Sequence, residues 1–469
     1  MAGTWSETNK QDIPGGYNRF KTIAEKRIEV GTTGTVAMPI KANWGPVKTV
    51  TTILEEKDLI NMFGKDNTAY KLGRLALLGQ PKELLLYRLA DGSEKVATVT
   101  LKNSEETPKD IIKLETKYPT TRAFSVSIKS NIVDNSKSLI LFEGARQLLT
   151  ILSLPKETEE IVNAINTNQD NKYIVASKVG DVTGTLADVV NVIFAGGNDG
   201  NGNITNEDYL EAMSVFESYD LDAFTLDGVS DSTLLTSVRN WTDIQKNNGN
   251  DFISFLGGDN ETTLEEANAK SKMMNSFNVV NIGDALYYED VLYSPAEVAV
   301  YIAALSVGLG LKECICNKRT VFTRMKKKHS KPEISNALKS GTLVFKEKDG
   351  AVIIVDDKNT YTEYTEEKNE VLGYIRAVRF INIVDRDTTV SDDKYIGDAI
   401  NDELGQISVI CALKKYFEAF EQERIIDKNF TVEVDKELQA NAKNDEFFWK
   451  WNANYINVMK KIYGTGYIR

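Results

Sequence analysis

The sequence contains a single histidine, His329, among its 469 residues. Histidine is the usual side chain for acid–base chemistry near neutral pH and for nitrogen-ligated metals, so one copy leaves little room for either. His329 follows the basic residues 324–328, and we expect it to lie in a surface segment. Three cysteines are too few for a disulfide framework and are typical of a reducing compartment. These scarcities count against an enzyme.

Long apolar runs are also absent. The longest uncharged run, residues 298–311, has 14 residues, whereas a membrane-spanning helix needs about 20. The N-terminal residues 1–16 are polar and lack the apolar stretch of a secretion signal, so we expect no signal peptide and no membrane insertion. Acidic residues outnumber basic ones by 68 to 56, a net charge of −12. A chain this acidic is a poor candidate for binding nucleic acid through its phosphates.

Length and pattern predict several domains, since a domain has roughly 150 residues. Residues 93–143 change to alternating apolar and polar positions, which indicates strands of a β-rich insertion. Polar residues 1–20, with Pro14, Gly15 and Gly16, are typical of an extended arm. The predicted division is an N-terminal arm 1–20, a core of 21–92 and 176–365, an inserted β-rich module 93–175, a C-terminal domain 366–461 and a C-terminal arm 462–469.

Residues 180–312 carry the clearest structural pattern. Short apolar runs at 221–226, 252–256 and 277–282 alternate with amphipathic stretches of about 10 to 15 residues, which predicts strands joined by helices in a mostly parallel sheet. The C-terminal part predicts a strand over 371–385, a helix over 406–423, a strand over 430–434 and a helix over 445–462. The fold class is therefore mixed α/β (α+β), multidomain, with a central mostly parallel sheet.

The glycine-rich stretch 196–203 has two ligand-binding interpretations, and both fail. A phosphate-binding loop ends in Gly-Lys-Ser/Thr, which is missing here. A calcium loop starting at Asp199 needs glycine and glutamate where the sequence has Ile204 and Leu210. We expect a tight glycine loop before a capped helix.

Asp227, Asp259 and Asp284 each follow a predicted parallel strand. Ligands bind at the carboxyl ends of such strands, so these acids form the site of an alternative hypothesis, a cytosolic α/β hydrolase or ligand-binding protein. The competing explanation is that they cap the helices or turns that follow. Cys314 and Cys316 form a Cys-x-Cys pair with too few partners for a zinc site, and we expect no metal or other cofactor.

Two basic segments interrupt the acidic chain. Residues 318–331 hold seven positive charges and no acid. Lys414 and Lys415 precede two aromatic residues in the helix predicted over 406–423. Either segment is suited to binding an acidic protein surface. The simpler explanation is that both are solvated, one as a loop and the other as the exposed face of a helix.

Several short patterns, taken together, resemble the contractile tail sheath family of myophages and R-type bacteriocins, in particular the sheaths of PBSX-like prophages and clostridial phage-tail-like particles. They occur in the family's order along nearly the whole chain. The matching pieces are Pro14-Gly15-Gly16-Tyr17, Trp44-Gly45-Pro46, Phe63-Gly64, Ala195-Gly196-Gly197-Asn198-Asp199-Gly200, Asn359-Thr360, Tyr395-Ile396-Gly397-Asp398 and Asp402-Glu403-Leu404-Gly405.

The resemblance implies a structural and non-enzymatic role. Sheath subunits form stacked hexameric rings around an inner tail tube, between a baseplate and a tail terminator, in a particle assembled in the bacterial cytoplasm. Contraction of this lattice drives the tube through a bacterial envelope. The resemblance also implies that the terminal arms add strands to the sheets of neighbouring subunits.

These implied roles define the candidate site residues. For the inter-subunit arms they are Ile13, Tyr17, Phe20, Ile462, Tyr463, Tyr467 and Ile468. For the tube contact the first candidates are Lys414 and Lys415, followed by Lys326, Lys327 and Lys328. The absence of convincing catalytic residues agrees with this structural role.

Overall fold

The computed structural model describes residues 34–65, 67–132, 134–366, 368–392 and 395–468. The chain divides into two compact units. The larger unit contains the described residues up to Arg386 together with residues 457–468. The smaller unit contains the described residues from Asp387 to Ile456.

A seven-stranded sheet organises the larger unit, with the strand order β17-β13-β12-β11-β1-β3-β2. All neighbouring strands are parallel except β2 and β3. The strands are β1 (Thr35–Ile40), β2 (Val50–Ile53), β3 (Glu83–Arg88), β11 (Ala223–Thr225), β12 (Ile253–Gly257), β13 (Val279–Ile282) and β17 (Thr342–Leu343). This arrangement confirms the mixed α/β class and the mostly parallel sheet predicted from the sequence.

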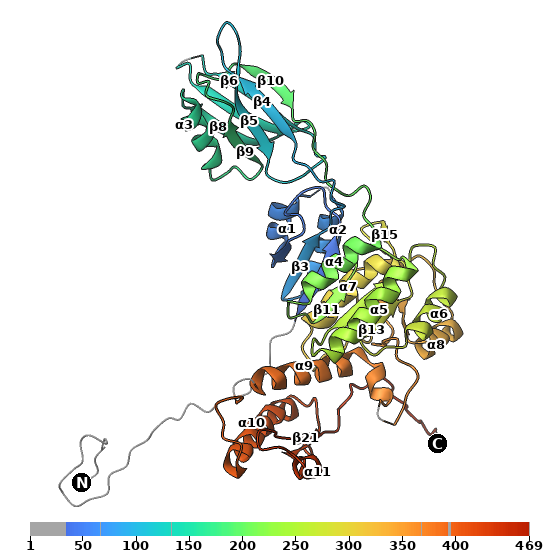
Figure 1. The fold of residues 1–469 in the computed structure, drawn as a ribbon. Helices are drawn as coiled ribbons and strands as arrows, with labels where there is room; N and C mark the ends of the chain where they lie inside the picture. The colour runs from blue at the N-terminus through green and yellow to red at the C-terminus, as the bar shows by residue number, and fades with distance from the viewer. Residues whose placement is uncertain (1–33, 66, 133, 367, 393–394, 469) are drawn as a thin grey trace, which may run out of the picture. The chain divides into compact units, whose positions relative to one another are not determined.

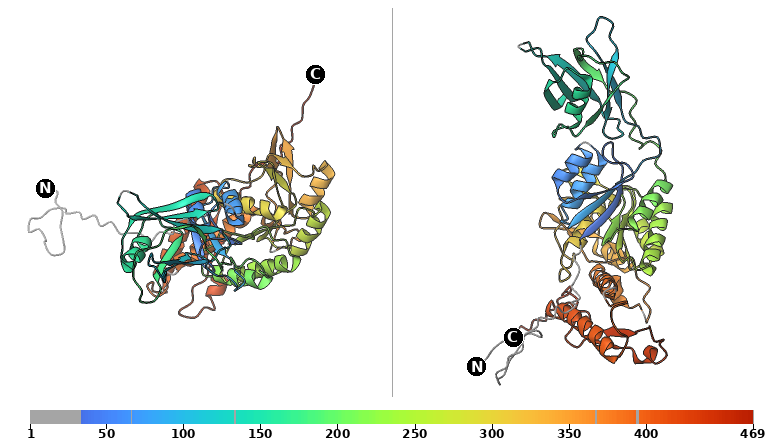
Figure 2. Two further views of the ribbon diagram at one scale, coloured as in Figure 1. Left: turned by 90° about the horizontal axis from the view of Figure 1, so that it is seen from above. Right: turned by 60° about the vertical axis from the view of Figure 1, so that its left-hand side comes forward.

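Helices cover both faces of this sheet (Figure 2). Alternate residues of each strand point to opposite faces, so Val36 and Met38 belong to one apolar cluster and Ala37 to the other. One cluster includes α1 (Glu56–Phe63), α2 (Thr68–Leu77) and α7 (Pro295–Gly308); the other includes α4 (Asn206–Phe216), α5 (Ser232–Asn247) and α6 (Leu264–Met274). Helix α8 (Lys331–Lys339) packs against β17.

Capping residues begin these helices as the sequence predicts. Ser294 accepts a hydrogen bond from the backbone N–H of Glu297, whose carboxylate accepts one in return, and Thr205 forms the same box with Asp208. Helix α7 is buried around most of its circumference, which explains the uncharged run in the sequence. Among the described residues, none of the helices combines the length and the hydropathy that crossing a bilayer requires.

A β-rich module follows β3 in the chain (Figure 1). It contains a four-stranded antiparallel sheet and a three-stranded antiparallel sheet around a shared apolar core. Its elements are β4 (Thr98–Lys102), β5 (Asp110–Thr116), β6 (Phe124–Ser130), β7 (Lys137–Glu143), β8 (Arg146–Leu154), α3 (Thr158–Asn166), β9 (Ile174–Lys178) and β10 (Val189–Ile193).

Two small sheets complete the larger unit. One joins β14 (Leu286–Tyr288), β15 (Val291–Tyr293) and β16 (Arg324–Met325), and the other is the hairpin of β18 (Phe345–Lys348) and β19 (Ala351–Ile354). The hairpin turn contains Asp349 and Gly350, both with positive φ, as the Lys-Asp-Gly sequence predicts.

The C-terminal region corrects two predictions. The strand expected over 371–385 is wrong, because these residues form η1 (Glu370–Gly373) and most of α9 (Ile375–Asp392). The helix expected over 445–462 is also wrong, because this stretch contains the strand β21 (Trp449–Asn452), which pairs with β20 (Thr431–Val434). Helix α10 (Glu403–Gln422) and strand β20 agree with the prediction, and a short helix α11 (Lys436–Gln439) was not anticipated.

Candidate assembly surfaces

Each of the three aspartates at the strand ends forms hydrogen bonds with a different part of the chain. Asp227 is buried and accepts a hydrogen bond from the Tyr209 hydroxyl at 2.6 Å. Its burial raises the pKa of this carboxyl. Asp259 accepts hydrogen bonds from Thr262 in the turn before α6.

Asp284, the third of them, is buried against the single histidine. Its carboxylate lies 2.5 Å from Nε2 of His329 and also accepts the backbone N–H of Phe345 at 2.9 Å. The His329 side chain is only 3% exposed, so the expectation of a surface position is wrong. Hydrogen bonding to Asp284 raises the pKa of His329.

These positions give the ligand-binding hypothesis no support. Asp227, Asp259 and Asp284 are engaged with different hydrogen-bond donors. In the part of the chain that the structure describes, no group of three or more histidine, cysteine, aspartate or glutamate side chains is arranged to hold a metal. Asp259 caps the turn that follows it, as the simpler sequence explanation predicts, whereas Asp227 and Asp284 make buried contacts with distant residues.

The basic segment before His329 is engaged with acids of the same chain. The Lys326 ammonium lies 3.0 Å from the Glu261 carboxylate, and the Lys328 ammonium lies 2.5 Å from that of Glu347. Lys327 is exposed. Exposed ion pairs of this kind contribute about 0 to 1 kcal/mol to stability. Their main effect is to neutralise positive charge that a partner would otherwise contact.

Lys414 and Lys415 lie on the exposed face of α10. The next two residues, Tyr416 and Phe417, point into the core of the smaller unit, where Phe417 lies 5.0 Å from Trp451 between ring centroids. The helix therefore presents its charged face outward.

An open pocket lies beside α10 in the same unit, and the sequence analysis missed it. Its volume is about 320 Å³. Exposed apolar side chains surround it, with Ile396 73% and Ile400 77% exposed. The lining residues come from 395–409 and 445–449. Exposed apolar side chains gathered at one place are typical of a surface that another chain covers.

The C-terminal arm is strongly exposed where it is described. Ile462, Tyr463, Tyr467 and Ile468 are each more than 80% exposed, and residues 453–468 form no helix or strand apart from a single bridge at Tyr455. The N-terminal candidates Ile13, Tyr17 and Phe20 lie outside the described residues.

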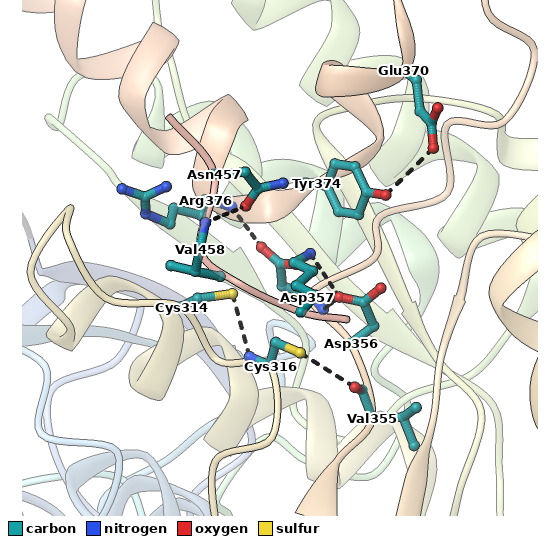
Figure 3. Close-up of polar contacts among 11 residues, drawn as sticks. Cys314, Cys316, Val355, Asp356, Asp357, Glu370, Tyr374, Arg376, Asn457 and Val458 are labelled. Atoms are coloured by element: carbon teal, nitrogen blue, oxygen red, sulfur yellow. Dashed lines mark hydrogen bonds and ion pairs between the residues drawn. The ribbon is translucent and has the colours of Figure 1, made fainter. Parts of the chain in front are cut away.

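A buried cation fixes the start of this arm. The Lys460 ammonium contacts the carboxylates of Asp356, at 2.7 Å, and of Asp357, and it lies 3.8 Å from the centroid of the Tyr374 ring. Burial lowers the pKa of Lys460, but the two carboxylates outweigh it and the net pKa is raised. Figure 3 shows the preceding residues Asn457 and Val458 close to this acidic pair. Nothing local in the sequence indicates this contact, because its partners are about a hundred residues apart.

Arg88 links the core sheet to the β-rich module and its returning connector. Its side chain is buried at the end of β3, and its guanidinium donates hydrogen bonds to the carbonyl oxygens of Gly45, Pro119 and Asp199 at 2.7 to 3.0 Å. Burial lowers the pKa of Arg88 to about 10. The outgoing and returning connectors also pair with each other, through bridges between Lys95 and Asn198 and between Thr98 and Ala195.

This joint explains two of the sequence motifs. Trp44 packs into the core of the module, 5.3 Å from Tyr118 and 5.4 Å from Phe124 between ring centroids. The glycine loop is the returning connector, and a Cβ on Gly197 would lie 2.3 Å from the carbonyl oxygen of Thr120. Both motifs therefore form part of the joint between the sheet and the module.

Four family models match successive parts of the chain. The model described as "Tail sheath protein Gp18 domain III N-terminal region" matches residues 33–89, and "Phage tail sheath protein beta-sandwich domain" matches residues 90–199. "Phage tail sheath protein central domain" matches residues 202–360, and "Phage tail sheath C-terminal domain" matches residues 367–469.

Similar proteins extend over most of the chain. The uncharacterized protein YqbK of Bacillus subtilis is 24% identical over 98% of this chain and 98% of its own. The phage-like element PBSX protein XkdK of the same species is 22% identical over 82% of this chain and 81% of its own.

Solved structures share the fold. The sheath tail protein of Desulfitobacterium hafniense superposes with a TM-score of 0.72 at 18% identity, over 94% of this chain and 100% of that one. The helical sheath of the anti-feeding prophage in its contracted state superposes with a TM-score of 0.56 at 11% identity, over 98% of this chain and 99% of that one. With four sheath domains matched in order and the sheath fold present, this chain belongs to the contractile phage tail sheath family and is a structural sheath protomer.

Proposed function

We propose that this protomer polymerises as stacked hexameric rings around an inner tail tube and contracts to drive the tube through a bacterial envelope. Neighbouring sheath subunits, the tube protein, the baseplate and a tail terminator are its partners, and the particle is assembled in the bacterial cytoplasm. The protomer acts without catalysis, through a change in its interfaces between two lattice states. The domain division predicted from the sequence, with arms 1–20 and 462–469, is part of this proposal.

The observation that carries the proposal is the anchored but exposed C-terminal arm. Lys460 is held by the half-buried Asp356 and the buried Asp357, whereas Tyr463 and Tyr467 are each 89% exposed a few residues later. Exposing large aromatic and branched side chains brings no benefit to an isolated chain, but the same side chains favour strands and suit pairing with the edge of a neighbour's sheet. We propose that residues 462–469 link one subunit to the next, together with Ile13, Tyr17 and Phe20 of the N-terminal arm.

A proline substitution tests strand pairing by this arm. Proline lacks the backbone N–H that a strand ladder requires, so Tyr467→Pro is expected to give a folded protein that forms no tubes. Tyr467→Val is the matched control, because valine loses the aromatic ring but favours strands, and this variant should assemble. Electron microscopy measures assembly, and circular dichroism checks folding. Tubes of normal length from the proline variant would contradict the proposal.

We further propose that Lys414 and Lys415 contact the tube, ahead of Lys326, Lys327 and Lys328. Lys414 and Lys415 lie side by side on an exposed helix face, next to aromatic residues that fix the helix in the core of the smaller unit. Electrostatic complementarity of this kind sets the docking register and the association rate of a partner. The predicted partner is therefore an acidic tube surface.

A further inference from the structure

A short loop after α7 brings two cysteines together. We refer to residues 310–318 as the CxC loop. The backbone N–H of Glu313 donates to the carbonyl oxygen of Gly310 at 2.9 Å, and the Lys318 ammonium lies 2.6 Å from the Glu313 carboxylate. Ile315, between the cysteines, is buried at 3% exposure. The loop is closed on itself by these contacts, and it contains no helix or strand.

A hydrogen bond links the two cysteines. The backbone N–H of Cys316 donates to Sγ of Cys314 at 3.4 Å. Sγ of Cys316 also donates to the carbonyl oxygen of Val355 at 3.4 Å (Figure 3). Cys314 is buried at 8% exposure, whereas Cys316 is half-buried. Only Cys316 is therefore placed to meet a reagent from solution.

The surroundings shift the pKa values of the two thiols in opposite directions. The hydrogen bond from Cys314 lowers the pKa of Cys316, and the same contact, followed by burial, raises the pKa of Cys314. Asp356 and Asp357 disfavour a thiolate here, and Lys460 favours one. A partly exposed thiol with a lowered pKa, two residues from a second and more deeply buried thiol, is the arrangement of an attacking and a resolving cysteine.

We propose that Cys314 and Cys316 form a dithiol–disulfide site that takes small-molecule disulfides of the glutathione class. The Cys316 thiolate attacks one sulfur of the disulfide, forming a mixed disulfide and releasing the other half as a thiolate. Cys314 then loses its proton to solvent and attacks Sγ of Cys316, which forms the internal disulfide and releases the second half. Both cysteines are oxidised, and one small disulfide is reduced to two thiols.

The test uses the full chain with Cys411→Ser, which leaves Cys314 and Cys316 as the only cysteines. This protein is incubated with oxidised glutathione, quenched with acid, alkylated and digested with trypsin. Cleavage after Lys312 and Lys318 places both cysteines in one peptide, residues 313–318. The expected product is that peptide with an internal disulfide, resistant to alkylation. Recovery of glutathione adducts or free thiols alone would overturn the proposal.

Two further variants separate the roles of the cysteines. With Cys314→Ala in the same background, the reaction is expected to stop at a glutathione adduct on Cys316. With Cys316→Ser, Cys314 is expected to react more slowly than Cys411 does in the unmodified chain, because it is buried. Two results would contradict the proposal. One is an equal rate of reaction with oxidised glutathione at Cys314 and Cys316, and the other is an internal disulfide that forms only after the protein is unfolded in urea.

Discussion

The buried Arg88 offers a stringent test of the joint between the core sheet and the β-rich module. Its planar guanidinium satisfies three carbonyl oxygens from three separate segments. Lysine keeps the charge, and therefore the cost of burying it, but a single ammonium on a flexible stem cannot reproduce this fork. Losing one or two charge-assisted hydrogen bonds, at about 1.5 to 3 kcal/mol each, gives an expected loss of about 3 kcal/mol for Arg88→Lys.

Arg88→Met should be at least as disruptive as Arg88→Lys, because methionine donates none of the three hydrogen bonds. Methionine also leaves the three carbonyls without this donor, but it removes the cost of burying a charge. The fall of the Arg88 pKa from 12.5 to about 10 corresponds to a burial cost of about 3 kcal/mol. With three hydrogen bonds lost at about 1.5 to 3 kcal/mol each and about 3 kcal/mol of burial cost recovered, we expect Arg88→Met to destabilise the joint by about 2 to 6 kcal/mol.

Hydrogen exchange measures this difference at the connectors themselves. The amides of Asp91, Lys95 and Asn198 donate to the carbonyl oxygens of Gly200, Asn198 and Lys95 at 2.8 to 2.9 Å. At tenfold per 1.4 kcal/mol, Arg88→Lys should speed their exchange by about a hundredfold. The matched control is Arg146→Lys, because the Arg146 side chain is 61% exposed and should leave these rates unchanged. Faster exchange in Arg88→Lys than in Arg88→Met would refute the claim that the three hydrogen bonds from Arg88 hold the joint.

Three further predictions follow from the structure. Because its pKa is raised in the folded state, protonated His329 should stabilise the protein below about pH 6.5, and this contribution should be lost as pH rises through the folded-state pKa. Thermal melts across this pH range test the prediction. His329→Gln should lack the pH-dependent contribution and should lose about 3 kcal/mol of unfolding free energy. Gly197→Ala should lower the melting temperature sharply because its Cβ would meet a carbonyl oxygen at 2.3 Å, whereas Gly202→Ala in the same loop, with its nearest atom at 3.8 Å, should be tolerated. Replacing Lys414 and Lys415 with glutamate should leave the fold and the melting temperature unchanged but prevent co-sedimentation with tail tubes; unchanged co-sedimentation would exclude α10 as the tube contact.

Local sequence signals predicted the central α/β region because its helices carry their own boundaries. Thr263 and Glu266, like Ser294 and Glu297, form capping boxes three residues apart, and the intervening strands are short apolar runs. Such signals lie within a few residues of each other. They need no knowledge of the rest of the chain, and the predicted helices and strands here agree with the structure to within a few residues.

The predictions failed where distant residues decide the structure. Helix α9 contains Arg376 and Arg379, which are buried and donate to the carbonyl oxygens of Leu311 and Leu309 after the end of α7. Arginines on a buried face interrupt the apolar periodicity that would indicate a helix, and the neighbouring β-branched residues favour a strand. In the stretch 445–462, where a helix was predicted, Trp451 packs on Phe417 from a strand.

The candidate surfaces were only partly accessible from the sequence. The resemblance supplied the arms and the lysines as candidates, and their roles stay predictions. His329, Arg88 and Lys460 have their partners 31 to 111 residues away in the chain, so no local pattern indicated these contacts. Buried charges of this kind depend on the assembled fold, because only the fold supplies the acceptors that compensate for lost water.

The most direct test of the central claim is negative-stain electron microscopy of the purified chain, alone at high concentration and together with its tail tube protein. The account predicts hollow tubes with a regular axial striation, formed alone or as a sleeve around the tail tube. Small discrete particles in both samples, with a folded protein confirmed by circular dichroism, would contradict a polymerising sheath.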